Sequence, residues 1–105
     1  MNFYRTKSWE ILRERILRMD GYVDQVALRL YGRRLEANTV HHIYPRREYP
    51  QFSLAPWNLV SVSDATHNAL ENRTTGELSE LGKQLQRLTA PGVDWRRRGS
   101  PRPDP

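Results

Sequence analysis

Apolar side chains recur every third or fourth residue near the start of the chain, on a background of charged residues. This spacing predicts an amphipathic helix over residues 8–19, which Ser8 or Thr6 can cap and which ends at Asp20 and Gly21. The apolar face of this helix consists of Trp9, Leu12, Ile16 and Met19. Residues 22–34 have apolar positions at mixed spacing, which predicts a short helix or an irregular turn.

Two short runs in the middle of the chain have the β-branched composition of strands. Residues 37–43 ("ANTVHHI") and 58–62 ("NLVSV") predict two strands that pair antiparallel. Between them, residues 44–57 contain three prolines, which exclude regular structure there. We expect this loop to be ordered because it holds four aromatic side chains: Tyr44, Tyr49, Phe52 and Trp57.

Helical spacing returns in the second half of the chain. A helix is predicted over about residues 64–72, with Ser63 or Asp64 as its cap. A last helix is predicted from a leucine series, with Thr74 and Glu77 at capping-box spacing before it. The series consists of Leu78, Leu81, Leu85 and Leu88.

The composition changes near the C-terminal end. Residues 91–105 are rich in proline, arginine and glycine, which predicts a flexible tail that Trp95 could hold down in part. Residues 1–90 would then form one folded domain. The predicted elements make it an α+β domain, mainly helical, with a two-stranded antiparallel hairpin packed on helices.

The chain of 105 residues has no cysteine, which excludes a disulfide, a cysteine-ligated zinc site and a thiol nucleophile. A cysteine-free chain fits a reducing compartment. The sequence has no apolar run typical of a signal peptide or of a membrane span, which needs about 20 residues. We therefore expect a cytoplasmic protein that does not contact a membrane.

The charge is positive and dominated by arginine. Lys and Arg number 17 against 12 Asp and Glu, a net charge of +5. The excess lies at the two ends, since residues 1–34 hold eight basic and four acidic side chains and residues 91–105 hold four and two. The planar guanidinium suits phosphate, so nucleic acid is the first partner to consider. The charge alone fits a well-solvated surface equally well.

The stretch "TVHHIYP" places two of the three histidines side by side on a predicted strand. Adjacent strand residues point to opposite faces, so His41 and His42 are expected to do different jobs. His67 lies near the start of the next helix, and Glu71 follows four residues later on the same helical face. Together, His67 and Glu71 could present a nitrogen and a carboxylate to a divalent ion.

The segments "VHHIYP" and "NLVSVSDATHN" resemble the HNH motif of the ββα-metal nuclease superfamily, especially its small phage and prophage members. The order and spacing of the family are followed from about Phe3 to Arg73, with the ββα core at about residues 37–73. A bare H-N-H pattern is a weak signal, whereas this ordered context is specific. The resemblance implies an endonuclease that hydrolyses DNA with one divalent metal ion, for which Mg²⁺, Mn²⁺, Ni²⁺ and Zn²⁺ are all candidates.

The resemblance also implies a role for each motif residue. His41 and His67 would be metal ligands, and Glu71 would be a third ligand, direct or through water. His42 would be the general base that takes a proton from the attacking water. Asn58 would fix the loop and the orientation of the base.

DNA contacts and partners are implied in the same way. Arg46 and Arg47 follow the first strand and could hold flanking phosphates. Arg33 and Arg34, in the basic N-terminal part, are the other candidates for DNA contact. The resemblance extends to phage nucleases that act beside the packaging terminase, so terminase or other packaging proteins are candidate partners. A monomer or weak dimer is expected, and the target sequence and the choice between nicking and double-strand cutting stay open.

The sequence departs from the family at one place. Many small members carry a structural zinc held by two C-x-x-C pairs. The corresponding positions here are Asp24, Ala27, Ser63 and Thr66, and none is a thiol. We expect no structural zinc, so apolar packing must close that region. Two rival interpretations are a catalytically inactive relative and an unrelated small basic nucleic-acid-binding module.

Overall fold

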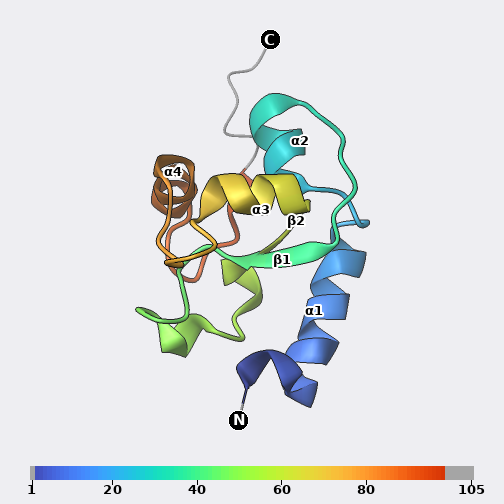
Figure 1. Cartoon of the computed structure of the whole chain (residues 1–105). Coiled ribbons are helices and arrows are strands. Elements are labelled where there is room, and N and C mark those ends of the chain that lie inside the picture. Colours follow the sequence, from blue (N-terminus) through green and yellow to red (C-terminus); the bar gives the residue numbers. More distant parts are fainter. Residues whose placement is uncertain (1, 99–105) are drawn as a thin grey trace.

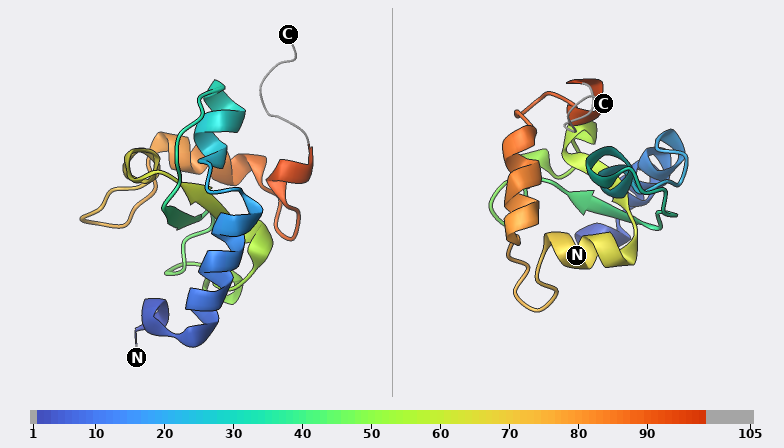
Figure 2. Two further views of the ribbon diagram at one scale, coloured as in Figure 1. Left: turned by 90° about the vertical axis from the view of Figure 1, so that its right-hand side faces the viewer. Right: turned by 90° about the horizontal axis from the view of Figure 1, so that it is seen from above.

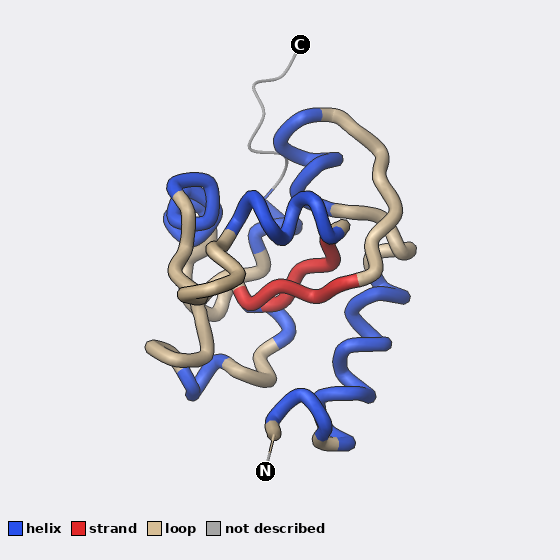
Figure 3. Tube along the Cα trace, in the orientation of Figure 1, coloured by secondary structure: helices blue, strands red, loops and turns tan. Residues whose placement is uncertain are grey.

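Two short antiparallel strands lie at the centre of the molecule (Figure 1). The structure is a computed structural model that describes residues 2–98. Strand β1 (Thr39–His42) pairs with β2 (Leu59–Val62), as predicted, and helices and loops surround the pair (Figure 3). Among residues 2–98, no helix is long and apolar enough to cross a membrane. The helices are α1 (Lys7–Met19), α2 (Gln25–Tyr31), α3 (Asp64–Leu70) and α4 (Glu80–Leu88), with 3-10 turns η1 (Phe3–Arg5), η2 (Pro50–Phe52), η3 (Pro56–Asn58) and η4 (Trp95–Arg98).

One face of the strand pair packs against α1. The helix is capped by Thr6, whose hydroxyl accepts a hydrogen bond from the backbone N–H of Trp9 at 3.3 Å. A buried cluster joins this helix to the strands: Trp9, Ile16, Leu17, Ala37, Val40 and Leu59. The predicted helix is confirmed, but its predicted apolar face is wrong at one position. Met19 is 55% exposed, and Leu17 packs against the strands instead.

The opposite face is covered by α2, α3 and α4 (Figure 2). Its buried cluster consists of Val26, Ile43, Val60, Val62, Leu70, Leu85 and Trp95. Residues directly opposite each other on paired strands share a face. His41 stands opposite Val60 and therefore lies on this side, whereas His42 stands opposite Leu59 on the α1 side. The two adjacent histidines are thus separated, as the alternation of the strand predicted.

The segment after α4 packs against the domain. Trp95 is 2% exposed, and the guanidinium of Arg96 contacts the carboxylates of Asp20 at 2.9 Å and Asp94 at 3.0 Å. The predicted anchor at Trp95 is therefore present. Packed structure therefore extends beyond the predicted boundary at residue 90. The sequence predicted a flexible tail that includes Arg96, whereas two carboxylates bind its guanidinium. The remainder of that tail, residues 99–105, lies outside the described residues.

The starts of α2 and α3 are tied together by one buried carboxylate. Asp24 is fully buried and caps α2, where its Oδ1 accepts a hydrogen bond from the N–H of Ala27 at 2.8 Å. Its Oδ2 accepts hydrogen bonds from the N–H and the hydroxyl of Ser63, each at 2.9 Å. Ser63 caps α3, and its oxygen contacts the hydroxyl of Thr66 at 3.1 Å. Hydrogen bonds therefore connect the four positions that correspond to the zinc-binding cysteines of many small HNH proteins. These bonds fix the start of α3, the helix that carries His67.

The turn between α3 and α4 differs from the prediction. Helix α4 begins at Glu80 with Ser79 as its cap, so the predicted capping box of Thr74 and Glu77 is wrong. The side-chain oxygen of Asn72 accepts a hydrogen bond from the N–H of Thr74 at 2.8 Å. Such a local side-chain bond holds the segment in a turn and competes with helix formation there.

Candidate active site

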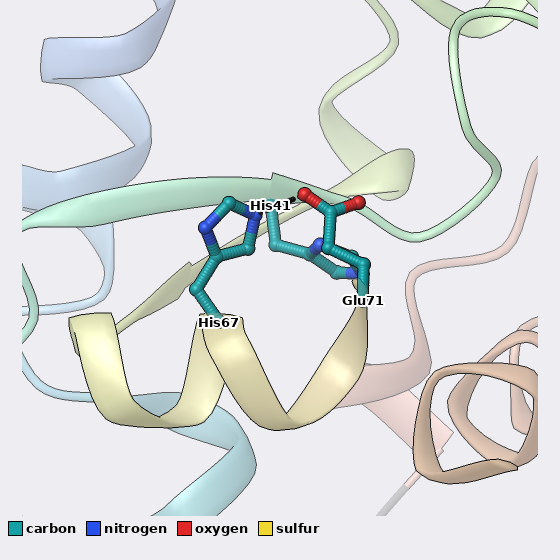
Figure 4. Close-up of side chains that lie close together, drawn as sticks. All are labelled: His41, His67 and Glu71. Carbon is teal, nitrogen blue, oxygen red and sulfur yellow. Dashed lines mark ion pairs between the residues drawn. The ribbon is translucent and has the colours of Figure 1, made fainter. Parts of the chain in front are cut away.

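Three side chains from separate elements converge above the strand pair. His41 comes from β1, His67 from α3, and Glu71 directly follows α3 (Figure 4). Each offers one possible ligand atom, and these atoms all lie within 4.8 Å of one another. The rings of His41 and His67 are 5.4 Å apart between centroids. Two imidazoles and a carboxylate at this spacing match the donor set of a divalent-metal site.

His41 is the most deeply buried member of this group. His41 is 1% exposed, and neither ring nitrogen has a hydrogen-bond partner among residues 2–98. Burial lowers the pKa of His41 from 6.5 to about 3, with the Glu71 carboxylate opposing this shift and two neighbouring histidines adding to it. The neutral imidazole is the form that binds metal. A buried polar group without a partner is rare, and a metal ion would supply the missing partner.

His67 and Glu71 form a close pair at the edge of the site. The Nε2 of His67 lies 2.7 Å from Oε1 of Glu71, and both side chains are about a quarter exposed. Burial raises the pKa of Glu71, but the His67 hydrogen bond and the nearby histidines outweigh it, so the net shift is downward. The prediction that Glu71 lies within the helix is wrong. The helix ends at Leu70, and Glu71 has extended backbone angles (φ −148°, ψ 153°) that still bring its carboxylate to His67.

His42 lies on the other side of β1 and is held from two directions. Its ring stacks on Trp9 at 5.1 Å between centroids with an interplanar angle of 21°. Its Nε2 is 3.0 Å from the carbonyl oxygen of Ser53. A carbonyl only accepts, so Nε2 carries the proton and Nδ1 is the unprotonated nitrogen. Burial lowers the pKa of His42, which keeps the ring neutral at neutral pH.

Asn58 closes the loop that contains Ser53. The side chain is fully buried, and its Oδ1 accepts a hydrogen bond from the N–H of Tyr44 at 2.7 Å. Its Nδ2 donates to the carbonyl oxygens of Tyr44 at 3.0 Å and Phe52 at 3.2 Å. Asn58, which follows the loop, therefore bonds to its first residue, Tyr44, and to Phe52. These bonds fix the backbone next to Ser53, whose carbonyl oxygen contacts His42.

A cleft of about 680 Å³ lies at this site. His42, His67 and Glu71 all line it, and so do two of the arginines that the sequence proposed for DNA contact, Arg46 and Arg47. The other two candidates, Arg33 and Arg34, are exposed in the segment between α2 and β1 and do not line this cleft.

Several residues that line the cleft were not predicted from the sequence. Trp9 was predicted as core, and nothing in the sequence indicates that its ring stacks on His42. Tyr4 and Arg13 also line the cleft, although both precede the histidine motif by many residues. The Ser53 carbonyl is a backbone group and leaves no signal in the sequence. Only the helical spacing of Trp9, which places it on the inner face of α1, offered a hint.

Comparison with solved structures identifies a relative of this chain. No protein-family profile matches the chain, and no curated protein sequence matches it. Among solved structures, the chain matches the HNH endonuclease of the deep-sea thermophilic bacteriophage GVE2, crystallised with manganese ion. The two chains are 33% identical and superpose with a TM-score of 0.61. The match covers 63% of this chain and 71% of the phage protein.

Proposed function

The chain belongs to the HNH endonuclease family, as its sequence predicted, and on that premise we propose that it is a metal-dependent endonuclease that hydrolyses phosphodiester bonds in DNA. One observation carries the proposal. The ligand atoms of His41, His67 and Glu71 lie within 4.8 Å of one another, and the neutral imidazole of His42 lines the same cleft as His67 and Glu71. Such a site offers both a metal ion and a general base for phosphodiester hydrolysis.

His41, His67 and Glu71 are the proposed holders of one divalent ion. When bound, the ion would supply positive charge to stabilise the charge that develops on the phosphate and on the leaving oxygen. The donor set fits Mg²⁺, Mn²⁺, Ni²⁺ and Zn²⁺. Manganese is the first ion to test, because the GVE2 enzyme was crystallised with it.

His42 is the proposed general base. Its Nδ1 accepts a proton from water as the water oxygen forms a bond to phosphorus and the bond to the leaving oxygen breaks. The hydrogen bond to the Ser53 carbonyl sets this tautomer and orients the ring. Because burial lowers the pKa of His42, the base is ready at neutral pH. General-base catalysis of this kind contributes about 100- to 10,000-fold to a rate.

Asn58 has the proposed role of positioning the base through the loop. Its three hydrogen bonds to Tyr44 and Phe52 fix the backbone immediately before Ser53. Arg46 and Arg47 are the proposed contacts to phosphates in the cleft. Arg33 and Arg34, being exposed and outside the cleft, are proposed only as contacts to more distant DNA.

Nicking of one strand is the proposed mode of cleavage. Within residues 2–98, a single group of histidine and acidic side chains has metal-binding spacing. One such site cuts one strand in a single encounter. Concerted double-strand cutting would need two copies of the chain on one DNA duplex.

Supercoiled plasmid provides the test of this function. The wild type is incubated with each of the four metal ions, with and without EDTA. We expect nicked circles with at least one ion and none with EDTA. Absence of nicking with every ion would contradict the enzyme and favour an inactive relative or a DNA-binding module. An activity that EDTA leaves unchanged would contradict the role of the metal.

A further inference from the structure

Arg46 is a half-buried cation that has no counter-ion within the described part of the chain. Its Nε is buried and has no hydrogen-bond partner, and no carboxylate among residues 2–98 lies within ion-pairing distance. Buried donors nearly always have a partner, and a charged group loses more than a neutral one when it lacks one. The side chain lines the same cleft as His42 and His67. An anion in the cleft would complete its contacts.

The Arg46 guanidinium lies over the ring of Phe3. Its central carbon lies 3.8 Å from the centre of the Phe3 ring and 5.4 Å from that of Tyr4. Stacking on an aromatic face leaves the N–H edges of a guanidinium free, and these edges match the oxygens of a phosphate. Arg47, the next residue, is exposed, and within the described residues no ring lies under its guanidinium.

Phe3 is itself firmly placed, although it comes from the short turn η1 at the start of the chain. Its ring contacts the ring of Trp9 at 5.2 Å and that of His42 at 6.0 Å. Its carbonyl accepts a hydrogen bond from the hydroxyl of Thr6 at 2.7 Å, which ties the turn to the cap of α1. The turn therefore forms a wall that contacts both the proposed base and Arg46.

We propose that Arg46 binds a backbone phosphate of DNA in the cleft, and that Phe3 is the positioning residue that holds its guanidinium there. The proposal rests on the proposed nuclease function, since the cleft is the same one. On this proposal, the turn η1 contributes to DNA binding at the active site through Phe3. It also ranks the two adjacent arginines, with Arg46 as the main phosphate contact and the exposed Arg47 as the weaker one.

The test compares Arg46→Ala with its neighbour Arg47→Ala in the full chain. A short DNA duplex is titrated in EDTA, without cleavage, over a range of salt concentrations. Loss of one phosphate contact reduces the slope of log affinity against log salt by about 0.9. We expect this reduction, with affinity lower by about tenfold, for Arg46→Ala. We expect a clearly smaller change for Arg47→Ala. Equal effects of the two substitutions would overturn the assignment of Arg46.

A double-mutant cycle tests the role of Phe3. Phe3→Leu keeps an apolar side chain but removes the ring, and Phe3→Tyr keeps the ring. We expect Phe3→Leu to weaken DNA binding in EDTA and to slow cleavage with Mn²⁺, and Phe3→Tyr to behave as the wild type. In the Arg46→Ala chain, Phe3→Leu should cause no further loss of DNA affinity. If Phe3→Leu reduced DNA affinity equally in the wild-type and Arg46→Ala chains, the positioning role of Phe3 would be overturned. Because binding is measured without metal, these results stand apart from any failure of the wild type to cleave.

Discussion

The Nε2 of His42 donates a hydrogen bond to the carbonyl oxygen of Ser53 across 3.0 Å. The orientation of the proposed base therefore depends on the backbone of a loop rather than on a second acidic side chain. The loop in turn depends on Asn58, which bonds to Tyr44 at its start and to Phe52, the residue before Ser53. This connection is the basis for the proposal that Asn58 affects catalysis.

Replacement of Asn58 should reduce both stability and activity. In Asn58→Ala, the N–H of Tyr44 and the carbonyls of Tyr44 and Phe52 lose their partners, at a cost of about 1–3 kcal/mol for each buried group left unsatisfied. Asn58→Asp keeps the acceptor but places a buried carboxylate oxygen against the carbonyl oxygens of Tyr44 and Phe52, so we expect it to be at least as destabilising as Asn58→Ala and also to cleave slowly. Urea unfolding and plasmid nicking measure the two effects. Full activity in a folded Asn58→Ala protein would contradict the positioning role.

Metal binding should raise the melting temperature. A ligand that binds only the folded state stabilises it by about 2.7 kcal/mol at 100 times its dissociation constant. For a domain of this size, each kcal/mol shifts the melting temperature by about 4–8 °C. We expect such a shift with Mn²⁺ for the wild type and its loss in His67→Ala. Glu77→Gln, which removes an exposed carboxylate from the same cleft, is the matched control and should keep the shift.

Stability in EDTA should fall as the pH falls below about 6.5. Burial lowers the pKa of His41 to about 3 and also lowers that of His42, so the unfolded chain binds protons that the folded chain does not. Protonation then favours unfolding, with a slope approaching about 1.4 kcal/mol per pH unit for each group. The loss from His41 begins near pH 6.5 and continues toward pH 3.

Urea unfolding at pH 7.5, 6 and 5 measures this slope. The lowered pKa of Glu71 acts in the same direction, but only at a pH below its ordinary value of 4.5. His41→Leu removes a buried titrating group and should flatten the dependence between pH 7.5 and 5. An unchanged slope in His41→Leu would show that its buried imidazole is not the source.

Asp24 should be essential for stability because its carboxylate accepts three hydrogen bonds while fully buried. Asp24→Asn replaces one accepting oxygen with a donor, so we expect a loss of about 2 kcal/mol or more. Ser63→Ala removes only the hydroxyl bond and should cost less. Because both residues fix the start of α3, the losses should not add in the double mutant. Strictly additive losses, measured by urea unfolding, would show that the two residues act independently.

Local patterns made much of the fold predictable. The spacing of Trp9 and Ile16 predicted α1, and the β-branched run around Val40 predicted β1, because helix and strand periods depend on neighbouring residues. Strand alternation also separated His41 from His42 correctly. The resemblance to the family then suggested that His41 and His67 lie close together. No local sequence pattern could have predicted this proximity.

Contacts between distant segments were not predictable. The stacking of Arg46 on Phe3 joins two parts of the chain that share no local pattern, and the Ser53 carbonyl is a backbone group common to every residue. The capping box at Thr74 failed because the Asn72 side chain competes for the same backbone N–H. Arg96 was left in a tail because its partner Asp20 lies at the far end of the chain.

The most direct measurement is the single-turnover rate of plasmid nicking by wild type and His42→Ala with saturating Mn²⁺. His42→Ala keeps His41, His67 and Glu71, so metal binding and DNA binding should persist. We predict a rate lower by about 100- to 10,000-fold, the range of general-base catalysis, with DNA affinity in EDTA within about threefold of the wild type. Equal rates for the two proteins would contradict the assignment of His42 as the base.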